Sequence, residues 1–230
     1  MSRSYAEPGT VPQFGEIWRA YSDQTFLMGL QLVDIDQARA WVPDGLKIVP
    51  ILPGKTLGSL LLASYGAGST LAYHECIVMP ALVAFGGSIG LWVSHLYVDD
   101  ERSCSGGRLL GYPKEMATFD WQEDPTHRVT ISQGDATLCT IASTPTTRRF
   151  PFWLGGPTLS LAGDDAIFSA SRFHAHYGRT RLAIKIPPDS PLAASTLTAP
   201  TLAFSGSHMH GNLAEFARRI GRLPVGTPIS

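Results

Sequence analysis

The sequence predicts a single-domain, mainly β protein built as a barrel or cone with a few peripheral helices. Short runs of β-branched, aromatic and aliphatic residues recur along the chain, separated by glycine, proline and aspartate turn signals. Few stretches have helical character, and none of them is long. A chain of 230 residues without an internal repeat fits one domain with a sizeable core.

The composition limits the partners we expect. The net charge is -1, only 16% of the residues are charged and no lysine-rich patch exists, so we expect no nucleic-acid partner. With 44% hydrophobic residues, part of the surface is predicted to be covered by other copies of the chain, as in a homo-oligomer.

The cysteines and the apolar runs indicate the compartment. Cys76, Cys104 and Cys139 are an odd number without a Cys-x-x-Cys pair, which is typical of a reducing, cytoplasmic setting. The N-terminus carries no apolar signal sequence, and no apolar run reaches the roughly 20 residues that span a membrane. The sequence therefore predicts a cytoplasmic protein without a membrane partner.

The first half of the chain predicts an arm, several strands and one helix. Residues 1–16 are polar and contain prolines, so we expect a flexible arm before a catalytic β domain at 17–230. Asp34 or Asp36 can cap a short helix at 38–42. Strands are expected at 26–33, 57–65, 73–85 and 89–98, with a bulge or edge at Pro80 and a polar loop at 99–107.

The second half predicts further strands and a last helix. Gly134-Asp135 is a hairpin signal between two of the strands. An apolar stretch at 150–156 is suited to wall a pocket. Strands are expected at 118–121, 128–133, 136–143, 166–176, 179–186 and 201–205, and a helix at 212–220.

Lys114 stands out as the candidate for chemistry. The chain has only four lysines, and this one lies in a largely apolar stretch after Gly111-Tyr112-Pro113. A desolvated lysine loses its proton more easily and becomes a nucleophilic amine, the starting point of Schiff-base catalysis. The alternative is a lysine at a strand end whose stem packs while its ammonium stays in water.

Several short motifs, in the same order along the chain, resemble those of the acetoacetate decarboxylase superfamily over roughly residues 20 to 220. They are Tyr73-His74-Glu75 for Tyr-x-Glu, Met79-Pro80, Leu96-Tyr97-Val98-Asp99 for Leu-Tyr-x-Asp, Gly111-Tyr112-Pro113-Lys114 for Gly-x-Pro-Lys, and Gly178-Arg179-Thr180-Arg181-Leu182 for Gly-x-Thr-Arg-Leu. The resemblance implies an antiparallel β cone with the lysine in its central cavity.

The resemblance also implies roles for individual residues. Lys114 would form an imine with a ketone, which serves as an electron sink, and Glu75 would shuttle protons or orient the substrate. No cofactor is implied. The positions expected to contact substrate are Tyr73, Tyr112, Met116, Gln24 and His208.

Three positions depart from the family's pattern. Glu115 stands where the decarboxylases have a second lysine, and strand alternation predicts that its side chain points away from the cavity. Ungapped counting puts Gln24 at the place of an arginine and Leu60 at the place of a second glutamate. Losing the arginine removes a clamp for the substrate carboxylate, which argues against acetoacetate itself.

The leading hypothesis is a cofactor-independent lyase that decarboxylates a small or medium apolar β-keto acid through an imine on Lys114. One alternative is a Schiff-base aldolase-dehydratase that joins a 2-oxo acid and an aldehyde. Another is a non-catalytic protein that binds a small molecule. The histidine pairs His174/His176 and His208/His210 have no acidic or cysteine ligand nearby in sequence, so no metal site is predicted.

Overall fold

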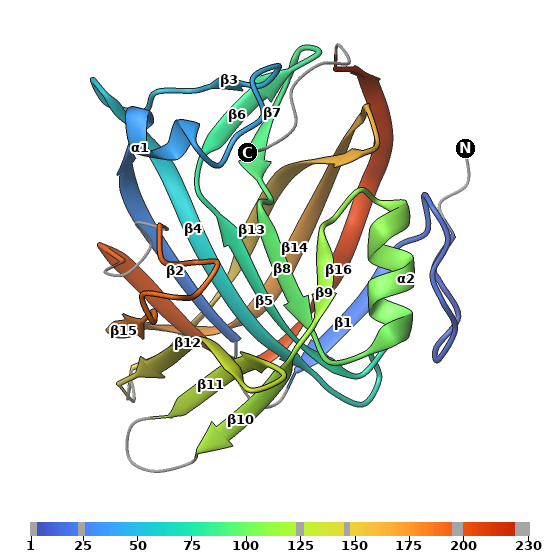
Figure 1. The fold of residues 1–230 in the computed structure, drawn as a ribbon. Coiled ribbons are helices and arrows are strands. Elements are labelled where there is room, and N and C mark those ends of the chain that lie inside the picture. Colours follow the sequence, from blue (N-terminus) through green and yellow to red (C-terminus); the bar gives the residue numbers. More distant parts are fainter. Residues whose placement is uncertain (1–3, 23–25, 123–126, 145–147, 195–199, 224–230) are drawn as a thin grey trace.

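The computed structural model describes residues 4–22, 26–122, 127–144, 148–194 and 200–223. This part of the chain forms a large curved sheet, a small sheet and two helices (Figure 1). A mainly β fold with peripheral helices is therefore confirmed. The elements are β1 (Trp18–Ser22), β2 (Phe26–Asp34), α1 (Ile35–Arg39), β3 (Lys47–Ile48), β4 (Lys55–Tyr65), β5 (Tyr73–Met79), β6 (Leu82–Phe85), β7 (Ser88–Trp92), β8 (His95–Val98), α2 (Glu101–Leu109), β9 (Lys114–Met116), β10 (Thr118–Gln122), β11 (Arg128–Gln133), β12 (Ala136–Ser143), β13 (Phe150–Ala162), β14 (Asp165–Thr180), β15 (Leu182–Lys185) and β16 (Leu202–Arg222).

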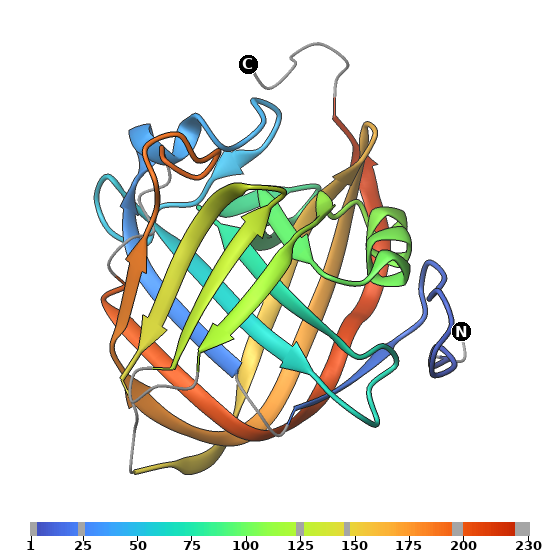
Figure 2. The same cartoon turned by 60° about the horizontal axis from the view of Figure 1, so that its bottom comes forward.

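The large sheet has the strand order β3-β6-β7-β13-β14-β16-β2-β4-β5-β8-β9, and β1 pairs with β16 beside this path. Its strands pair antiparallel except for β7 with β13 and β8 with β9, which are parallel. The small sheet, β10-β11-β12-β15, lies across strands of the large one (Figure 2). The lysine strand β9 is the edge strand of the large sheet.

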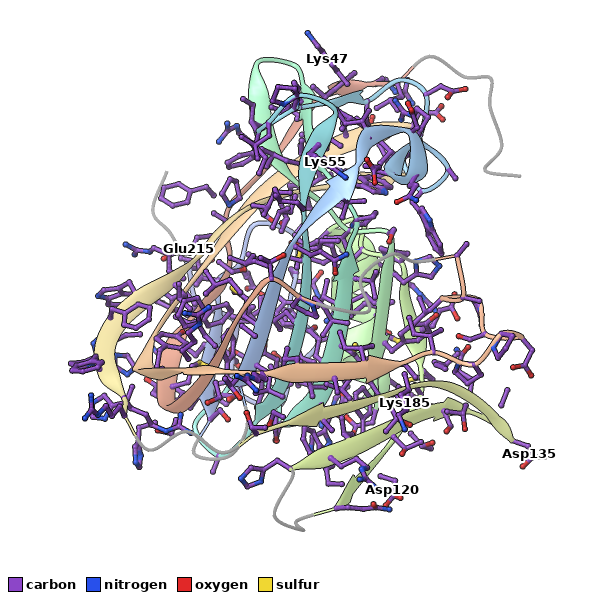
Figure 3. All side chains as sticks on the ribbon, turned by 90° about the vertical axis from the view of Figure 1, so that its left-hand side faces the viewer. Lys47, Lys55, Asp120, Asp135, Lys185 and Glu215 are labelled. Carbon is purple, nitrogen blue, oxygen red and sulfur yellow. The ribbon has the colours of Figure 1, made fainter. Side chains whose placement is uncertain are left out.

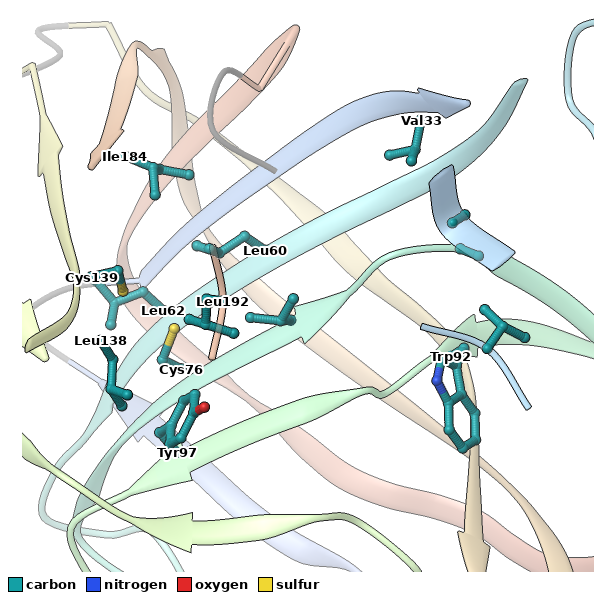
Figure 4. Close-up of a cluster of buried hydrophobic side chains, with 14 of the residues drawn as sticks. Val33, Leu60, Leu62, Cys76, Trp92, Tyr97, Leu138, Cys139, Ile184 and Leu192 are labelled. Carbon is teal, nitrogen blue, oxygen red and sulfur yellow. The ribbon is translucent and has the colours of Figure 1, made fainter. Parts of the chain in front are cut away.

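Strand alternation divides the core into two clusters. One face of β4 and β5 carries residues such as Leu60, Leu62 and Cys76, which pack against the small sheet and α1 (Figure 4). The other face carries residues such as Leu61 and Tyr73, which turn into the concave side of the large sheet. The concave side therefore has its own core, separate from the layer that covers the convex side.

The prediction of a loop at 99–107 is wrong, because α2 forms there. Asp100 caps it by accepting hydrogen bonds from the backbone N–H groups of Arg102 and Ser103. Two glycines inside the helix lower its propensity. The glycines allow other side chains to pack directly on the helix backbone. A Cβ at Gly106 would lie 3.0 Å from the ring of Trp18, and a Cβ at Gly107 would collide with Lys114.

The helix predicted at 212–220 is also wrong, since these residues continue β16. Their apolar spacing resembles a helix, but β14 pairs with this segment at Asn212, Glu215, Arg218 and Arg219. The register between the two strands shifts repeatedly, and Ala214 and Phe216 take positive φ values of 59° and 60°. These irregularities break the alternation that would have revealed a strand.

Other predicted boundaries shift modestly. The strand at 73–85 is two strands, divided at Pro80, which cannot donate a hydrogen bond to a ladder. In the N-terminal segment, Ala6 is buried and its N–H donates to the carbonyl of Ile17, whose own N–H donates to the carbonyl of Ser4. Neither helix among the described residues is long and apolar enough to span a membrane.

Candidate active site

Lys114 is buried on the concave side of the large sheet. Its side chain is 3% exposed, whereas the other three lysines lie on the outside of the molecule (Figure 3). The backbone of β9 places it there, because Lys114 lies beside Leu96 of β8 and shares the inward direction of that buried side chain. A lysine is seldom buried without a partner, so its contacts are informative.

The amine has two hydrogen-bond acceptors and two aromatic neighbours. Nζ donates to Oε2 of Glu75 at 2.9 Å and to Oγ of Ser103 at 2.8 Å. The ring centroids of Trp18 and Tyr73 each lie 5.0 Å from Nζ, within the range of cation–π attraction. The amine is therefore held in place by groups from β5, α2 and β1.

Glu75 is held as firmly as the lysine. It is 2% exposed and accepts hydrogen bonds from the hydroxyls of Tyr65 at 3.1 Å and Tyr73 at 3.2 Å. Burial, followed by the negative charge of Glu75, raises the pKa of both phenols well above their usual value. Both tyrosines therefore remain protonated donors to the carboxylate at any working pH.

Helix α2 contacts both the amine and the stem of Lys114. Ser103 lies in its first turn, three residues after the capping Asp100. Gly107 lies one turn further and lets the lysine stem pass against the helix, since a Cβ there would lie 2.6 Å from Cε of Lys114. Sequence reasoning missed Ser103, and the signal that could have found it is the aspartate cap just before it.

The turn between α2 and β9 sets the position of Tyr112. Gly111 takes a φ of +70°, and a Cβ there would press against the backbone of Leu161, so glycine is required. The Tyr112 hydroxyl lies 2.9 Å from Oγ1 of Thr158 and 2.6 Å from Oγ of Ser169. This hydroxyl cluster joins the lysine turn to β13 and β14.

These side chains surround a cavity of about 40 Å³ at the amine. Apart from Lys114 and Glu75, no described residue that lines it carries a charge. The lining residues are Trp18, Tyr73, Glu75, Ile77, Val93, Leu96, Leu110, Tyr112, Lys114, Thr158, Ser171, Leu213 and Ala214. An amine beside a carboxylate in such a cavity is suited to attack a carbonyl and to move protons.

Lys114, Glu75, Tyr73 and Tyr112 thus come together as the sequence predicts, but two other predicted contacts do not. Met116 is 41% exposed and does not line the cavity, because it ends the edge strand beyond the reach of the concave side. His208 is exposed at a positive φ of 51°, with its ring 6.0 Å from that of His176.

Three further positions complete the comparison with the prediction. Gln24 lies outside the described residues. Glu115 is exposed and accepts a hydrogen bond from Gln133, so its side chain does not face the amine. Leu60 packs on the convex side and does not face the amine, while Ser59 and Leu61 face the concave side.

A family model described as Acetoacetate decarboxylase (ADC) matches residues 5–151. Protein NEOXANTHIN-DEFICIENT 1 of Solanum lycopersicum is 33% identical over 94 residues, which are 40% of this chain and 32% of that protein. Decarboxylase DEC1 of Cochliobolus heterostrophus is 30% identical over 113 residues, 47% of this chain and 42% of that protein. The matches thus span less than half the length of these curated relatives.

Solved structures share the fold at low identity. An acetoacetate decarboxylase from Legionella pneumophila superposes with a TM-score of 0.65 at 13% identity, covering 93% of this chain and 90% of that one. The enduracididine biosynthesis enzyme MppR, complexed with pyruvate, superposes with a TM-score of 0.62 at 13% identity, covering 90% and 91%. At these identities the likeness concerns the fold alone.

Proposed function

Since the chain belongs to the acetoacetate decarboxylase family, we propose that it is a cofactor-independent lyase that decarboxylates a β-keto acid through an imine on Lys114. One observation carries the proposal. The amine of Lys114 is buried and bonded to Glu75 and Ser103 at the wall of a mostly apolar cavity. Lys55 also contacts a carboxylate, that of Asp34, but both groups are well exposed to solvent.

Glu75 gives the amine a place to leave its proton. The hydrogen bond from Nζ to Oε2 is the path by which the proton moves from the amine to the carboxylate, which leaves a neutral amine and a neutral acid. The neutral amine can then attack a ketone. The hydroxyls of Tyr65 and Tyr73 hold the carboxyl group in position throughout.

In the reaction that follows, Glu75 gives up one proton and receives another. The amine adds to the ketone carbon, and the proton that Glu75 took from the amine moves to the carbinolamine hydroxyl, which leaves as water and gives an iminium ion. The bond to the carboxylate then breaks, its electron pair enters the C=N system as an enamine, and carbon dioxide leaves. The enamine carbon takes a proton from solvent by way of Glu75, and water hydrolyses the resulting iminium to release the ketone and the lysine.

The residues around the amine favour the positive charge of the imine and disfavour the negative charge of the substrate carboxylate. The faces of Trp18 and Tyr73 lie 5.0 Å from Nζ and stabilise positive charge there. The substrate carboxylate finds no second cation among the described lining residues, only hydroxyls such as those of Tyr112 and Thr158. Loss of carbon dioxide removes this poorly solvated charge.

A rival uses the same imine for aldol condensation and dehydration. MppR, a structure of similar fold, has been solved with pyruvate and with the condensation product of pyruvate and imidazole 4-carboxaldehyde. Decarboxylation is favoured because a decarboxylase, DEC1, is among the sequence relatives. A third possibility is a non-catalytic protein that binds a small molecule in the cavity, with Lys114 forming at most an ion pair and no imine.

The test is a trapping experiment with matched substrates. The protein is incubated with β-keto acids, or with pyruvate and an aldehyde, then reduced with borohydride and mapped by mass spectrometry. We expect an adduct on Lys114 alone and carbon dioxide from the β-keto acid. An adduct without carbon dioxide, together with an unsaturated product from pyruvate, would favour the rival. An adduct at Lys47, Lys55 or Lys185, or none, would overturn the proposal.

A further inference from the structure

A second, larger cavity continues from the lysine site into the concave side of the sheet. Its volume is about 220 Å³, against about 40 Å³ at the amine. The two cavities share Ile77, Thr158, Ser171 and Leu213 as common walls, so they are neighbours rather than separate sites. A substrate as small as acetoacetate would leave the larger cavity unused.

The lining of this cavity is apolar almost throughout. None of the described residues that line it carries a charge. β2 contributes Met28 and Leu30, β4 contributes Leu57 and Leu61, and β14 contributes Phe173. Alternation explains the pattern, because every second residue of these strands turns to the concave side. Water finds few hydrogen-bond partners in such a space. A bound hydrocarbon chain removes from water both its own apolar surface and that of the cavity wall.

One polar side chain interrupts this lining. Ser59 of β4 is 1% exposed and lines the cavity, and among the residues that the structure describes its Oγ has no hydrogen-bond partner. A buried hydroxyl without a partner is unfavourable and calls for an explanation. Ala63 pairs with Glu75, and Ser59 lies four residues before it on β4, so the hydroxyl lies about 13 Å along the strand from the level of the lysine site.

We propose that the substrate carries an apolar chain that occupies this cavity and an oxygen that hydrogen-bonds Ser59. This inference rests on the proposed imine at Lys114 for the position of the carbonyl group. The hydrogen bond itself spans about 3 Å, and an extended chain advances about 1.25 Å per bond, so roughly eight bonds separate the reacting carbon from that oxygen. The substrate class is thus a medium-chain 3-oxo acid with an oxygen function towards the end of its chain.

A chain-length series tests the apolar part. Acetoacetate, 3-oxohexanoate and 3-oxodecanoate are compared by kcat/KM for carbon dioxide release. Each buried methylene should raise kcat/KM roughly fourfold. Equal kcat/KM for all three acids would overturn the inference while leaving the imine chemistry intact.

Gly156 provides the blocking variant. It lines the cavity and pairs with Ser171, and a Cβ added there would meet no atom within 4 Å, so the side chain of Gly156→Leu starts in open space. We expect this variant to lose most of the preference for 3-oxodecanoate over acetoacetate. Gly66→Leu is the matched control, since a Cβ there also meets open space but lies outside this cavity.

Ser59→Ala tests the polar part. The wild type should prefer the terminally hydroxylated 3-oxodecanoate over the unsubstituted acid, and the variant should lose this preference by roughly fivefold, as expected for one hydrogen bond. An unchanged preference would remove Ser59 from the proposal.

Binding separates this inference from the proposed function. If no keto acid forms an adduct, the dissociation constants of straight-chain methyl ketones are measured by calorimetry for the wild type and Gly156→Leu. Binding that tightens with chain length only in the wild type supports the cavity's role without an imine. Binding that is independent of chain length overturns it.

Discussion

At the scale of residues, the buried contact between Lys114 and Glu75 is the feature from which the chemistry follows. Replacing Glu75 by glutamine keeps the shape and one of the two oxygens that accept from Tyr65 and Tyr73, but it removes the group that accepts the amine proton. Turnover should fall roughly a hundredfold or more, as for loss of a general acid–base group.

The neighbouring Glu115→Gln is the control, because that carboxylate is exposed and bonded to Gln133. Steady-state kinetics and circular dichroism on both variants make the comparison. Wild-type turnover in Glu75→Gln would show that its carboxylate has no part in the reaction.

Gly107 tests whether the position of the amine matters as much as its presence. Alanine favours a helix interior by about 1 kcal/mol over glycine, so Gly107→Ala should not unfold α2. Its Cβ would lie 2.6 Å from Cε of Lys114, and the flexible lysine stem is what yields. The amine then leaves Glu75 and Ser103, so kcat and the yield of the borohydride adduct should fall while the melting temperature stays within a few degrees.

The two principal residues of the site could be identified from sequence, and their supports could not. Lys114 and Glu75 lie in short local motifs, so they can be recognised without a structure. Ser103 and Tyr65 reach the site only through the geometry of α2 and the pairing of β4 with β5. The catalytic roles of Lys114 and Glu75 stay predictions until the variants above are measured.

At the scale of elements, the cap of α2 links helix stability to the site. Asp100 is the N-cap, and Asp100→Ala should destabilise the protein by about 0.5–2 kcal/mol. Because Ser103 and Gly107 lie on this helix, the variant should also lower activity. Urea denaturation together with kinetics measures both effects.

The same cap should be sensitive to acid. Burial raises the pKa of Asp100, but its bonds to Arg102 and to the N–H of Ser103 outweigh this and lower the pKa overall. The charged cap therefore contributes fully above the unfolded value of about 3.9 and is lost as the pH falls through the lower folded value. The stability gap between wild type and Asp100→Asn should thus shrink below about pH 4. A gap that grows on acidification would contradict this.

Elements were predictable where alternation is regular. The strands at 128–133 and 136–143 appear with the predicted bounds, because a glycine turn and local pairing define them. Helix α2 was missed since its glycines serve the contacts with Trp18 and Lys114 rather than a loop. The end of β16 was mistaken for a helix because its bulges break the period of two.

At the scale of the whole molecule, exposed aromatic side chains support the predicted homo-oligomer. Trp153 is 55% exposed, Phe150 66% and Phe216 47%, all on β13 and β16 of the large sheet. Trp153 and Phe216 line one surface pocket, and exposed apolar groups that lie together mark association sites. With a net charge of only -1, little electrostatic repulsion opposes self-association.

The last prediction is that this aromatic region mediates the assembly. Light scattering at micromolar concentration should give a multiple of the single-chain mass, and Trp153→Glu should reduce it by placing a charge in the contact. Leu52→Glu is the matched control, because Leu52 is 52% exposed but lies between β3 and β4, away from β13 and β16. Its mass should stay that of the wild type. A single-chain mass for the wild type would contradict the homo-oligomer, and an equal loss in both variants would place the contact elsewhere.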